Sequence, residues 1–599
     1  MKKKHIAFWI VFPIAFIQIL ALTLFYLDIA NGPFYVFVMT LIILALFVLM
    51  NILVINKKMR IRICTWLLLI FYFVGVFFVA HPRERIKSIA YYNNPTKTEI
   101  LETKNGKIQG LYNEDKSVMM YAGIPYAKAP VGDLRWKEPQ KLENWADVKE
   151  CFNFAPISMQ SPQAPVVSSL VNIYAQGFWR PDYSTTYVEP ISEDSLYLNV
   201  WKPSTGTNLP ILVYIHGGAL TTGQSSFEDY NGEEMAKKGV IMITITYRLG
   251  IFGYLALDEL ANESSNHTTG NYGLLDQIEA LKWINDNAEV FGGNKDNITI
   301  AGESAGSSSV SAICTSPLAK GLFKRAIGES SSLVVKLPPH TFRTLEAAKE
   351  VGNNIKKEFN ATTVNDLRKI KAEDLLKSKY TNSEMTLDGY ALTKMPYKVY
   401  EEGNNNEEAL LNGYNVKEAD AFVVPKYLLS PTNKDNIEER LNTVFDKETT
   451  TKIINLYKDK IEADAFNALN EIMSVYWFYY PHESWSRMAS ANGLDVYRYQ
   501  FTKTNNYYST YHSGELIYAY GNVYKTPYKY RYNDTDIDLS NKMLSYWVNF
   551  IKTGNPNGEG LPSWPTWDYK NILELGDKIG LIDDKSTELY KIIDDFLKV

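Results

Sequence analysis

The chemistry of this chain is signalled first by Gly302-Glu-Ser-Ala-Gly306, which fits the pattern G-x-S-x-G. A short β-branched stretch precedes this segment, and small Ser and Val residues open a helix-like segment after it. That context indicates a nucleophile elbow, a turn so sharp that the serine is pushed out of the backbone. The flanking glycines are needed because a Cβ there would collide with the strand or the helix. The pentapeptide alone also fits a glycine-rich turn, but in this context it predicts that Ser304 is the nucleophile of a hydrolase.

A second feature of acyl-transfer chemistry lies upstream, at the end of an apolar run. Residues 209–216 have the pattern of a buried strand and lead into small residues. Small residues at the end of such a strand let main-chain N–H groups approach a substrate carbonyl and hold an oxyanion. His216 fits the structure of this loop better than the role of a catalytic base. The expected oxyanion donors are the N–H groups of Gly218, Ala219 and Ala305.

The elements that must position these groups follow the pattern of a parallel, doubly wound sheet. Residues 240–246 form a β-branched apolar run, and residues 277–290 have apolar side chains at helical spacing. The order strand, helix, strand and then elbow predicts an α/β fold with a mostly parallel sheet. The charged stretch 341–384 is expected to be helical and to cap the sheet.

Residues 1–87 differ from the rest of the chain and predict a membrane region. The runs 6–30, 35–55 and 63–80 are largely apolar, and each is about long enough to cross a bilayer as a helix. The first run is too long for a signal peptide and lacks a clear small-x-small cleavage site. The sequence therefore predicts three transmembrane helices before one long catalytic domain, residues 88–599.

The positive charges predict how these spans are oriented. Lysines at 2–4 precede the first span, and Lys or Arg residues at 57–62 lie between the second and the third, whereas the loop 31–33 has none. The positive-inside rule places the N-terminus and the second loop in the cytoplasm. Three spans then place the catalytic domain outside the cell, although basic residues at 83–87 weakly oppose this.

Charge and cysteine content exclude several classes of protein. Residues 1–87 hold 10 Lys or Arg and 2 Asp or Glu, which leaves 52 basic and 65 acidic residues, a formal charge of −13, for the remainder. Such an acidic domain gives no support to nucleic-acid binding. Cys64, Cys151 and Cys314 have no metal-ligand spacing. An exported domain with two cysteines does not rely on disulfides, which favours a bacterial envelope over eukaryotic secretion.

Ordered motifs from about Ile100 to Tyr569 resemble the type-B carboxylesterase family, which includes cholinesterases and bacterial para-nitrobenzyl esterases. The matching segments are 123–127, 130–136, 193–199, 270–277, 291–293, the elbow, 547–550, 554–557 and 564–565. The resemblance implies an α/β-hydrolase fold, a mostly parallel twisted sheet with helices on both faces. The three predicted membrane spans lie outside it.

The chain departs from the family's pattern in two places. The family usually has a cysteine pair where this sequence has Ser158 and Ser195. In relatives the loop between these positions lines the mouth of the active-site gorge, so we expect it to be more mobile here. Another departure is the segment Ile327-Gly-Glu-Ser-Ser331, where relatives tend to have Gln-Ser-Gly.

The resemblance also implies which residues complete a catalytic triad. His512, in the segment 512–521, resembles the family's catalytic histidine, whereas His340 and His482 have the pattern of ordinary surface or core residues. Glu418, five residues after a glycine, resembles the family's acid, and Asp420 is the alternative. Glu303, beside the nucleophile, is expected to act electrostatically.

These residues predict a membrane-anchored serine carboxylesterase. His512 is expected to take the proton from Ser304 during attack on an ester carbonyl, while Glu418 orients the histidine. Water then releases the acid from the acyl-enzyme, and no cofactor or metal is needed. Two other functions remain open: a lipase that acts on membrane lipids, and a non-catalytic adhesion or binding protein. The acyl and alcohol preference and the oligomeric state are not predicted.

Overall fold

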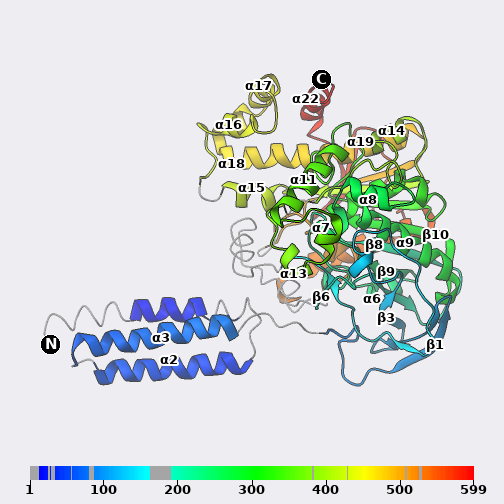
Figure 1. Cartoon of the computed structure of the whole chain (residues 1–599). Coiled ribbons are helices and arrows are strands. Elements are labelled where there is room, and N and C mark those ends of the chain that lie inside the picture. The colour runs from blue at the N-terminus through cyan, green and yellow to red at the C-terminus, as the bar shows by residue number, and fades with distance from the viewer. Residues whose placement is uncertain are drawn as a thin grey trace. The chain divides into compact units, whose positions relative to one another are not determined.

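A computed structural model describes residues 13–23, 27, 34–54, 57–79, 86–161, 190–380, 383–427, 430–505, 509–524 and 529–598 (Figure 1). The chain separates into two compact units. One unit holds Met1–Arg85 and Pro162–Glu189, and the other holds Ile86–Ser161 and Pro190–Val599.

The larger unit is built on a long β-sheet. Its strands and the two short strands beside it are β1 (Lys97–Thr103), β2 (Gly106–Tyr112), β3 (Val118–Pro125), β4 (Lys149–Glu150), β5 (Ile157–Ser158), β6 (Ile191–Ser192), β7 (Tyr197–Pro203), β8 (Leu209–Ile215), β9 (Ile241–Ile245), β10 (Gly293–Glu303), β11 (Arg325–Glu329), β12 (Ala409–Asn415), β13 (Asp495–Phe501), β14 (Asn571–Leu575) and β15 (Ile579–Asp583).

The strand order is β1-β2-β3-β7-β9-β8-β10-β11-β12-β13-β14-β15, with β4 paired to β2, while β5 and β6 form a separate pair. From β9 through β8 to β14 every pairing is parallel. Along this order the pairings at the two ends of the sheet are antiparallel, whereas β4 pairs with β2 in parallel. The predicted parallel sheet is therefore confirmed for its centre, where the carboxyl ends of β8, β10 and β11 meet at one edge.

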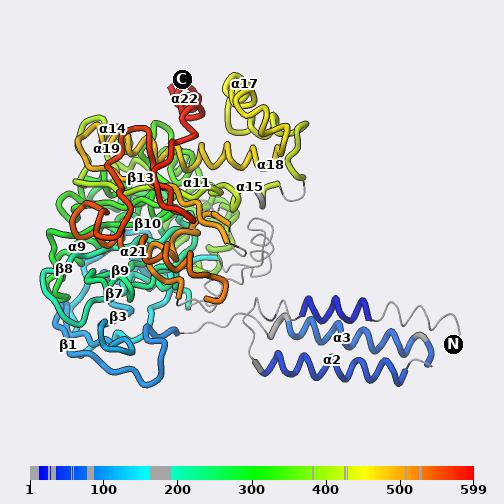
Figure 2. Tube along the Cα trace, turned by 180° about the vertical axis from the view of Figure 1, so that it is seen from behind, coloured from blue at the N-terminus to red at the C-terminus, as the bar shows by residue number. Residues whose placement is uncertain are grey.

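The helices of the larger unit are α6 (Glu233–Lys237), α7 (Gly250–Tyr254), α8 (Asp258–Glu263), α9 (Tyr272–Asn287), α10 (Ala305–Thr315), α11 (Leu345–Glu358), α12 (Val364–Arg368), α13 (Ala372–Leu375), α14 (Pro396–Glu401), α15 (Asp420–Tyr427), α16 (Ile437–Leu441), α17 (Lys447–Leu456), α18 (Lys458–Ser474), α19 (Tyr480–Ala491), α20 (Leu516–Ala519), α21 (Asp534–Thr553) and α22 (Thr587–Phe596). A π-helical turn, Val475–Tyr479, joins α18 to α19. The opposite views in Figures 1 and 2 show helices on both faces of the sheet.

Helix α21 illustrates how the sequence sets the bounds of these helices. Asn533 accepts hydrogen bonds from the first-turn N–H groups, and Asp536 bonds back to the Asn533 N–H, which forms a capping box. Gly554 ends the helix at φ 84°, a conformation that glycine adopts without strain. One face of the helix is buried and carries Trp547 into the core. The predicted charged helical stretch 341–384 is confirmed as three shorter helices, α11, α12 and α13.

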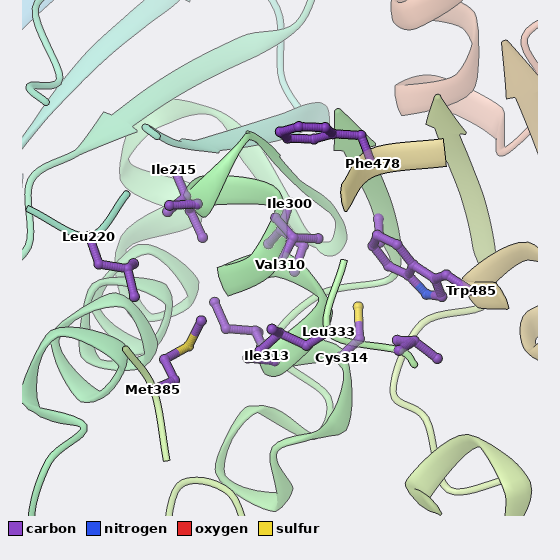
Figure 3. Close-up of a cluster of buried hydrophobic side chains, with 14 of the residues drawn as sticks. Ile215, Leu220, Ile300, Val310, Ile313, Cys314, Leu333, Met385, Phe478 and Trp485 are labelled. Atoms are coloured by element: carbon purple, nitrogen blue, oxygen red, sulfur yellow. The ribbon is translucent and has the colours of Figure 1, made fainter. Parts of the chain in front are cut away.

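The central strands are continuous apolar runs in the sequence because they lie in the core. Strand β9 is buried at every residue, because helices cover both faces of the sheet. Figure 3 shows Ile215 of β8 and Ile300 of β10 packed with Val310 and Ile313 of α10. Burial of each such side chain contributes about 1.5–3 kcal/mol to folding. This packing holds the start of α10 against the end of β10.

The smaller unit contains the long helices α2 (Phe34–Val54) and α3 (Met59–Val79). Among the described residues one helix, Tyr35–Val54, is long and apolar enough to cross a membrane by length and composition, and a shorter apolar helix covers Pro13–Thr23. That test therefore supports one of the three predicted spans. The predicted span 63–80 overlaps α3, and much of 6–30 lies outside the described residues.

The two serines at the family's cysteine positions are in direct contact. The Ser158 hydroxyl donates to the Tyr247 carbonyl at 2.6 Å, its Oγ lies 3.0 Å from Ser195 Oγ, and both serines are buried. The predicted mobile loop between them lies, for residues 162–189, outside the described residues.

We predict that the double substitution Ser158→Cys and Ser195→Cys forms a disulfide under oxidising conditions. The two Oγ atoms already lie close enough that sulfur atoms at these positions would need little backbone movement. A cross-link of this loop length is expected to stabilise the fold by about 4 kcal/mol. Thermal unfolding with and without reductant measures this gain, with Ser158→Cys alone as the control. An equal melting temperature in both conditions, with the disulfide formed, would contradict the prediction.

Candidate active site

Ser304 lies at the junction of β10 and α10 in a strained conformation. Its φ of 55° and ψ of −125° place its backbone in a region that residues other than glycine rarely adopt. The Ser304 N–H donates to the Glu329 carbonyl at 2.8 Å, and its own carbonyl accepts from Ser308 N–H at 3.0 Å. The elbow predicted from G-x-S-x-G is therefore present, and its side chain is partly exposed to a pocket.

The glycines of the motif are required by close main-chain approach. A Cβ at Gly306 would lie 2.1 Å from the Ile215 carbonyl oxygen, and one at Gly302 would lie 2.6 Å from Gly306 main chain. Real Cβ atoms do not reach such distances, so any larger residue would push α10 away from β8. The motif is thus explained by packing around Ser304.

His512 lies within hydrogen-bond distance of the nucleophile. Its Nε2 is 2.9 Å from Ser304 Oγ, and its Nδ1 is 2.5 Å from Glu418 Oε2. A bridge between Lys417 and Tyr511 holds the loops that carry the acid and the histidine side by side. Three residues that are far apart in the sequence are thereby in one hydrogen-bonded line, in the order that the sequence predicted.

Glu418 is fully buried and held by two further donors. Its Oε1 accepts the Ser330 hydroxyl at 2.5 Å and the Asn415 main-chain N–H at 2.7 Å. The alternative acid, Asp420, begins α15 and accepts a hydrogen bond from Asn470. The contact of Ser330 was not predicted from the sequence, where only the departure at 327–331 marked this segment.

The loop after β8 lies directly against the nucleophile. A Cβ at Gly217 would lie 3.0 Å from Ser304 Cβ and 2.9 Å from Glu303 Oε2. Gly218 and Ala219 have positive φ, 106° and 54°, which turns the chain sharply at this point. Within the described part of the chain, no hydrogen-bond acceptor faces the N–H groups of Gly218 and Ala219. These groups, with the first N–H of α10 at Ala305, are free to receive an oxyanion.

The electrostatics of the site are dominated by carboxyl groups. Glu303 Oε1 lies 3.3 Å from His512 Nε2 and accepts the Ser513 hydroxyl at 2.6 Å. Burial raises the pKa of Glu303 to about 7. Burial disfavours the charged imidazolium of His512, but Glu303 and Glu418 outweigh it and raise the pKa of His512 to about 9.

The other histidines take no part in this line of contacts. His216 is buried, stacks on Tyr247 and has its pKa lowered to about 4 by burial, so it is neutral in the loop. His482 is buried in α19. His340, for which the sequence predicted a surface loop, is half-buried and lies in the wall of the pocket, with its Nε2 3.0 Å from the Trp477 carbonyl. The two prolines before His340 predict a loop, but they do not indicate whether that loop faces solvent or the pocket.

The nucleophile opens into a cavity of about 320 Å³. Its walls are largely apolar and aromatic. The residues that line it are Ala219, Thr221, Ser304, Pro339, His340, Thr341, Ser383, Glu384, Phe422, Trp477 and Phe478. The rings of Phe422 and Phe478 also contact His512, with centroids 5.4 and 5.0 Å from the imidazole. These aromatic residues, which the sequence did not single out, shield the histidine from water.

Comparisons with known proteins place the whole larger unit among characterised sequences. A family model described as the carboxylesterase family matches residues 97–590. Carboxylesterase 1E of Mus musculus is 31% identical over 532 residues, which cover 81% of this chain and 91% of that protein. The para-nitrobenzyl esterase of Bacillus subtilis (strain 168) is 32% identical over 511 residues, which cover 82% of this chain and 97% of the relative.

Solved structures of carboxylesterases have a similar fold. The structure of the Geobacillus stearothermophilus carboxylesterase EST55 at pH 6.2 superposes with a TM-score of 0.70 at 29% identity, and the match covers 83% of this chain and 100% of the EST55 chain. A PNB esterase structure has a TM-score of 0.68 at 30% identity, with 83% and 99% of the two chains covered.

Proposed function

This chain belongs to the carboxylesterase family and is a carboxylic ester hydrolase, and on that premise we propose that it is a membrane-anchored serine carboxylesterase with a Ser304, His512 and Glu418 triad. The observation that carries the proposal is the continuous hydrogen-bonded line from Ser304 Oγ through the His512 ring to Glu418. A hydroxyl is a poor nucleophile unless a base lies within hydrogen-bond reach and a third group orients that base.

In the first half-reaction, the Ser304 hydroxyl attacks the ester carbonyl and donates its proton to His512 Nε2. Glu418 accepts the Nδ1–H of the same ring, which fixes the tautomer and stabilises the imidazolium. The tetrahedral oxyanion is held by the N–H groups of Gly218, Ala219 and Ala305. Loss of one such donor would cost about 3 kcal/mol of transition-state stabilisation.

The first half-reaction ends when His512 gives its proton to the leaving alcohol, which leaves an acyl group on Ser304. The second half-reaction uses the same groups: water attacks the acyl-enzyme, His512 takes its proton, and the oxyanion forms again on the same donors. The carboxylic acid then leaves and Ser304 recovers its proton. Every proton transfer is supplied by the side chains named, so the proposal needs no cofactor or metal.

The chemistry of the cavity supports small or medium-sized esters with apolar groups. Its aromatic wall favours uncharged acyl or alcohol groups, and about 320 Å³ lies at the lower end of small-molecule sites. Hydrolysis of short-chain p-nitrophenyl esters by the full chain in detergent, beside dispersed long-chain lipid, tests this substrate class. Faster release of acid from the lipid would favour the lipase reading.

A non-catalytic adhesion role is the remaining alternative. It requires that one member of the line from Ser304 to Glu418 be unable to react. The distances of 2.9 and 2.5 Å argue against this. Labelling of the wild-type chain by an organophosphate, absent in Ser304→Ala, would support the enzyme, and a folded chain that is neither labelled nor active would exclude it.

We also propose that residues 1–87 form a membrane region with spans 6–30, 35–55 and 63–80, and that the carboxylesterase domain, residues 88–599, lies outside the cell. In support, Thr40 Oγ1 and Tyr72 OH lie 3.0 Å apart between α2 and α3, and Thr40 also donates to the Val36 carbonyl, so these polar groups are satisfied among apolar neighbours. A reporter active only outside the cytoplasm, fused after residue 87, tests the orientation, with a fusion after residue 57 as the control.

The raised pKa of His512 predicts an alkaline working range. The general base is the neutral imidazole. Nearby Glu303 and Glu418 outweigh the effect of burial and raise the pKa of His512 from the ordinary value of 6.5 to about 9. We therefore expect kcat/KM to rise with pH across the neutral range, with a midpoint well above 6.5. A pH profile with an uncharged ester substrate measures this midpoint. A midpoint below the ordinary histidine value would contradict the prediction.

A further inference from the structure

Glu329, in the segment that departs from the family's pattern, lies next to the acidic neighbour of the nucleophile. It ends β11, and the parallel register pairs it with Glu303 at the end of β10. Paired residues of parallel strands project from the same face of a sheet, with the strands about 4.8 Å apart. The Glu329 carbonyl also accepts the Ser304 N–H at 2.8 Å. Two glutamates therefore lie side by side beneath the elbow.

Both carboxyl groups are removed from water, and they differ in their neighbours: Glu303 contacts the His512 ring and the Ser513 hydroxyl, whereas the side-chain partners of Glu329 are neutral donors. Glu329 is fully buried, its Oε1 accepts the Trp547 indole N–H at 3.0 Å, and its Oε2 accepts the Tyr520 hydroxyl at 3.1 Å. The ionisable groups that face Glu329 are Glu303 on β10, Glu515 before α20, Tyr520 after α20, Tyr214 on β8 and Tyr499 on β13. None of these five groups is a cation.

The buried carboxyl groups of Glu303, Glu329 and Glu515 form a cluster in which at least one group is expected to be protonated. Glu515 is also fully buried, and its Oε1 has no hydrogen-bond partner among the described residues, nor has the Tyr499 hydroxyl. Full ionisation of three buried neighbouring carboxyl groups is disfavoured by desolvation and by mutual repulsion. Accordingly, burial and then the neighbouring Glu303 raise the pKa of Glu329 to about 8.

We propose that Glu329 is a positioning residue that acts through Glu303: the two carboxyl groups share one proton, and loss of that proton makes His512 hold its own proton more tightly. Glu303 Oε1 lies 3.3 Å from His512 Nε2, so a change of charge on the pair is felt directly by the imidazole. A second negative charge favours the imidazolium, which cannot act as base, and so moves the working range to higher pH. The inference rests on the proposed role of His512 as the base.

Glu329→Gln in the full chain tests this inference, because glutamine keeps the shape of the side chain but cannot ionise. We expect the acid limb of the kcat/KM profile to shift to a pH lower by up to about one, with the gain in activity confined to pH values above about 8, where the wild-type pair has lost its shared proton. Glu407→Gln is the matched control, since Glu407 is buried with a raised pKa but bonds to Tyr400 instead. The control is expected to leave the midpoint where it is.

Two further measurements keep the test decisive. Tyr520→Phe removes the hydroxyl donor to Glu329 Oε2, which disfavours ionised Glu329 and should shift the limb in the same direction if Glu329→Gln does not fold. NMR titration of the His512 ring in isotope-labelled wild type and variant reports the same shift without turnover, so it separates this inference from the esterase assignment. Equal His512 midpoints in wild type and Glu329→Gln, or a shift to higher pH, would overturn it.

Discussion

Replacement of Ser304 by alanine is expected to lower kcat for ester hydrolysis by about 10⁵- to 10⁶-fold, the size of effect seen when a triad nucleophile is removed. The reason is direct, since among the described residues the hydroxyl that meets His512 Nε2, at 2.9 Å, and opens to the cavity is that of Ser304. Residual hydrolysis would come from water held by the oxyanion donors. Turnover of a short-chain p-nitrophenyl ester by the full chain in detergent measures the loss.

The same substitution should leave the fold intact, which makes its result easy to interpret. Alanine and serine share the strained conformation at φ 55°, so the strain is unchanged. Ser304→Gly, in contrast, relieves that strain and should raise the free energy of unfolding by about 1–2 kcal/mol while remaining inactive. Retention of more than a few per cent of wild-type activity in a folded Ser304→Ala chain would refute the assignment of the nucleophile.

Replacement of Glu418 by glutamine is expected to lower kcat by about 10³- to 10⁴-fold. Glutamine can occupy the same space, but it carries no charge to stabilise the imidazolium, and its amide can hold His512 in the wrong tautomer. Because Glu418 is fully buried and accepts from Ser330, Asn415 and His512, no other carboxylate can move into its place.

Asp420→Asn is the matched control for Glu418→Gln. Asp420 lies two residues further on, is also buried, and bonds to Asn470 instead of the histidine. Its substitution is expected to change kcat by less than about threefold, since it removes no interaction with the reacting groups. If Asp420→Asn were the inactive variant and Glu418→Gln the active one, the acid would have been assigned to the wrong residue.

Some features follow from local sequence because local geometry is enough to produce them. The elbow needs a strand, a tight turn and a helix in immediate succession, and the glycines at 302 and 306 are demanded by contacts within that turn and with β8. Continuous apolar runs at β8 and β9 predicted central parallel strands, because only strands buried on both faces lack polar alternation. The helix over 277–290 followed in the same way from its period, although α9 begins five residues earlier.

Other features depended on elements that approach one another only in the folded chain. Spacing could not show whether Glu418 or Asp420 contacts His512, because that contact forms beside the bridge from Lys417 to Tyr511, which joins residues almost a hundred positions apart. His340 looked like a surface residue until the turn 475–479 enclosed it. The apolar wall of the pocket comes from α15 and that same turn, neither of which has a distinctive motif.

Short ordered motifs in the sequence were enough to identify the family, and they predicted Ser304 as the nucleophile and His512 as the base. The surroundings of these residues could be found only from the tertiary structure. The register between β10 and β11 puts Glu329 beside Glu303, the loop after β11 brings Ser330 to Glu418, and two serines meet where relatives have cysteines. Such pairings depend on which strands are neighbours and on their register, which the burial of side chains in the folded sheet decides.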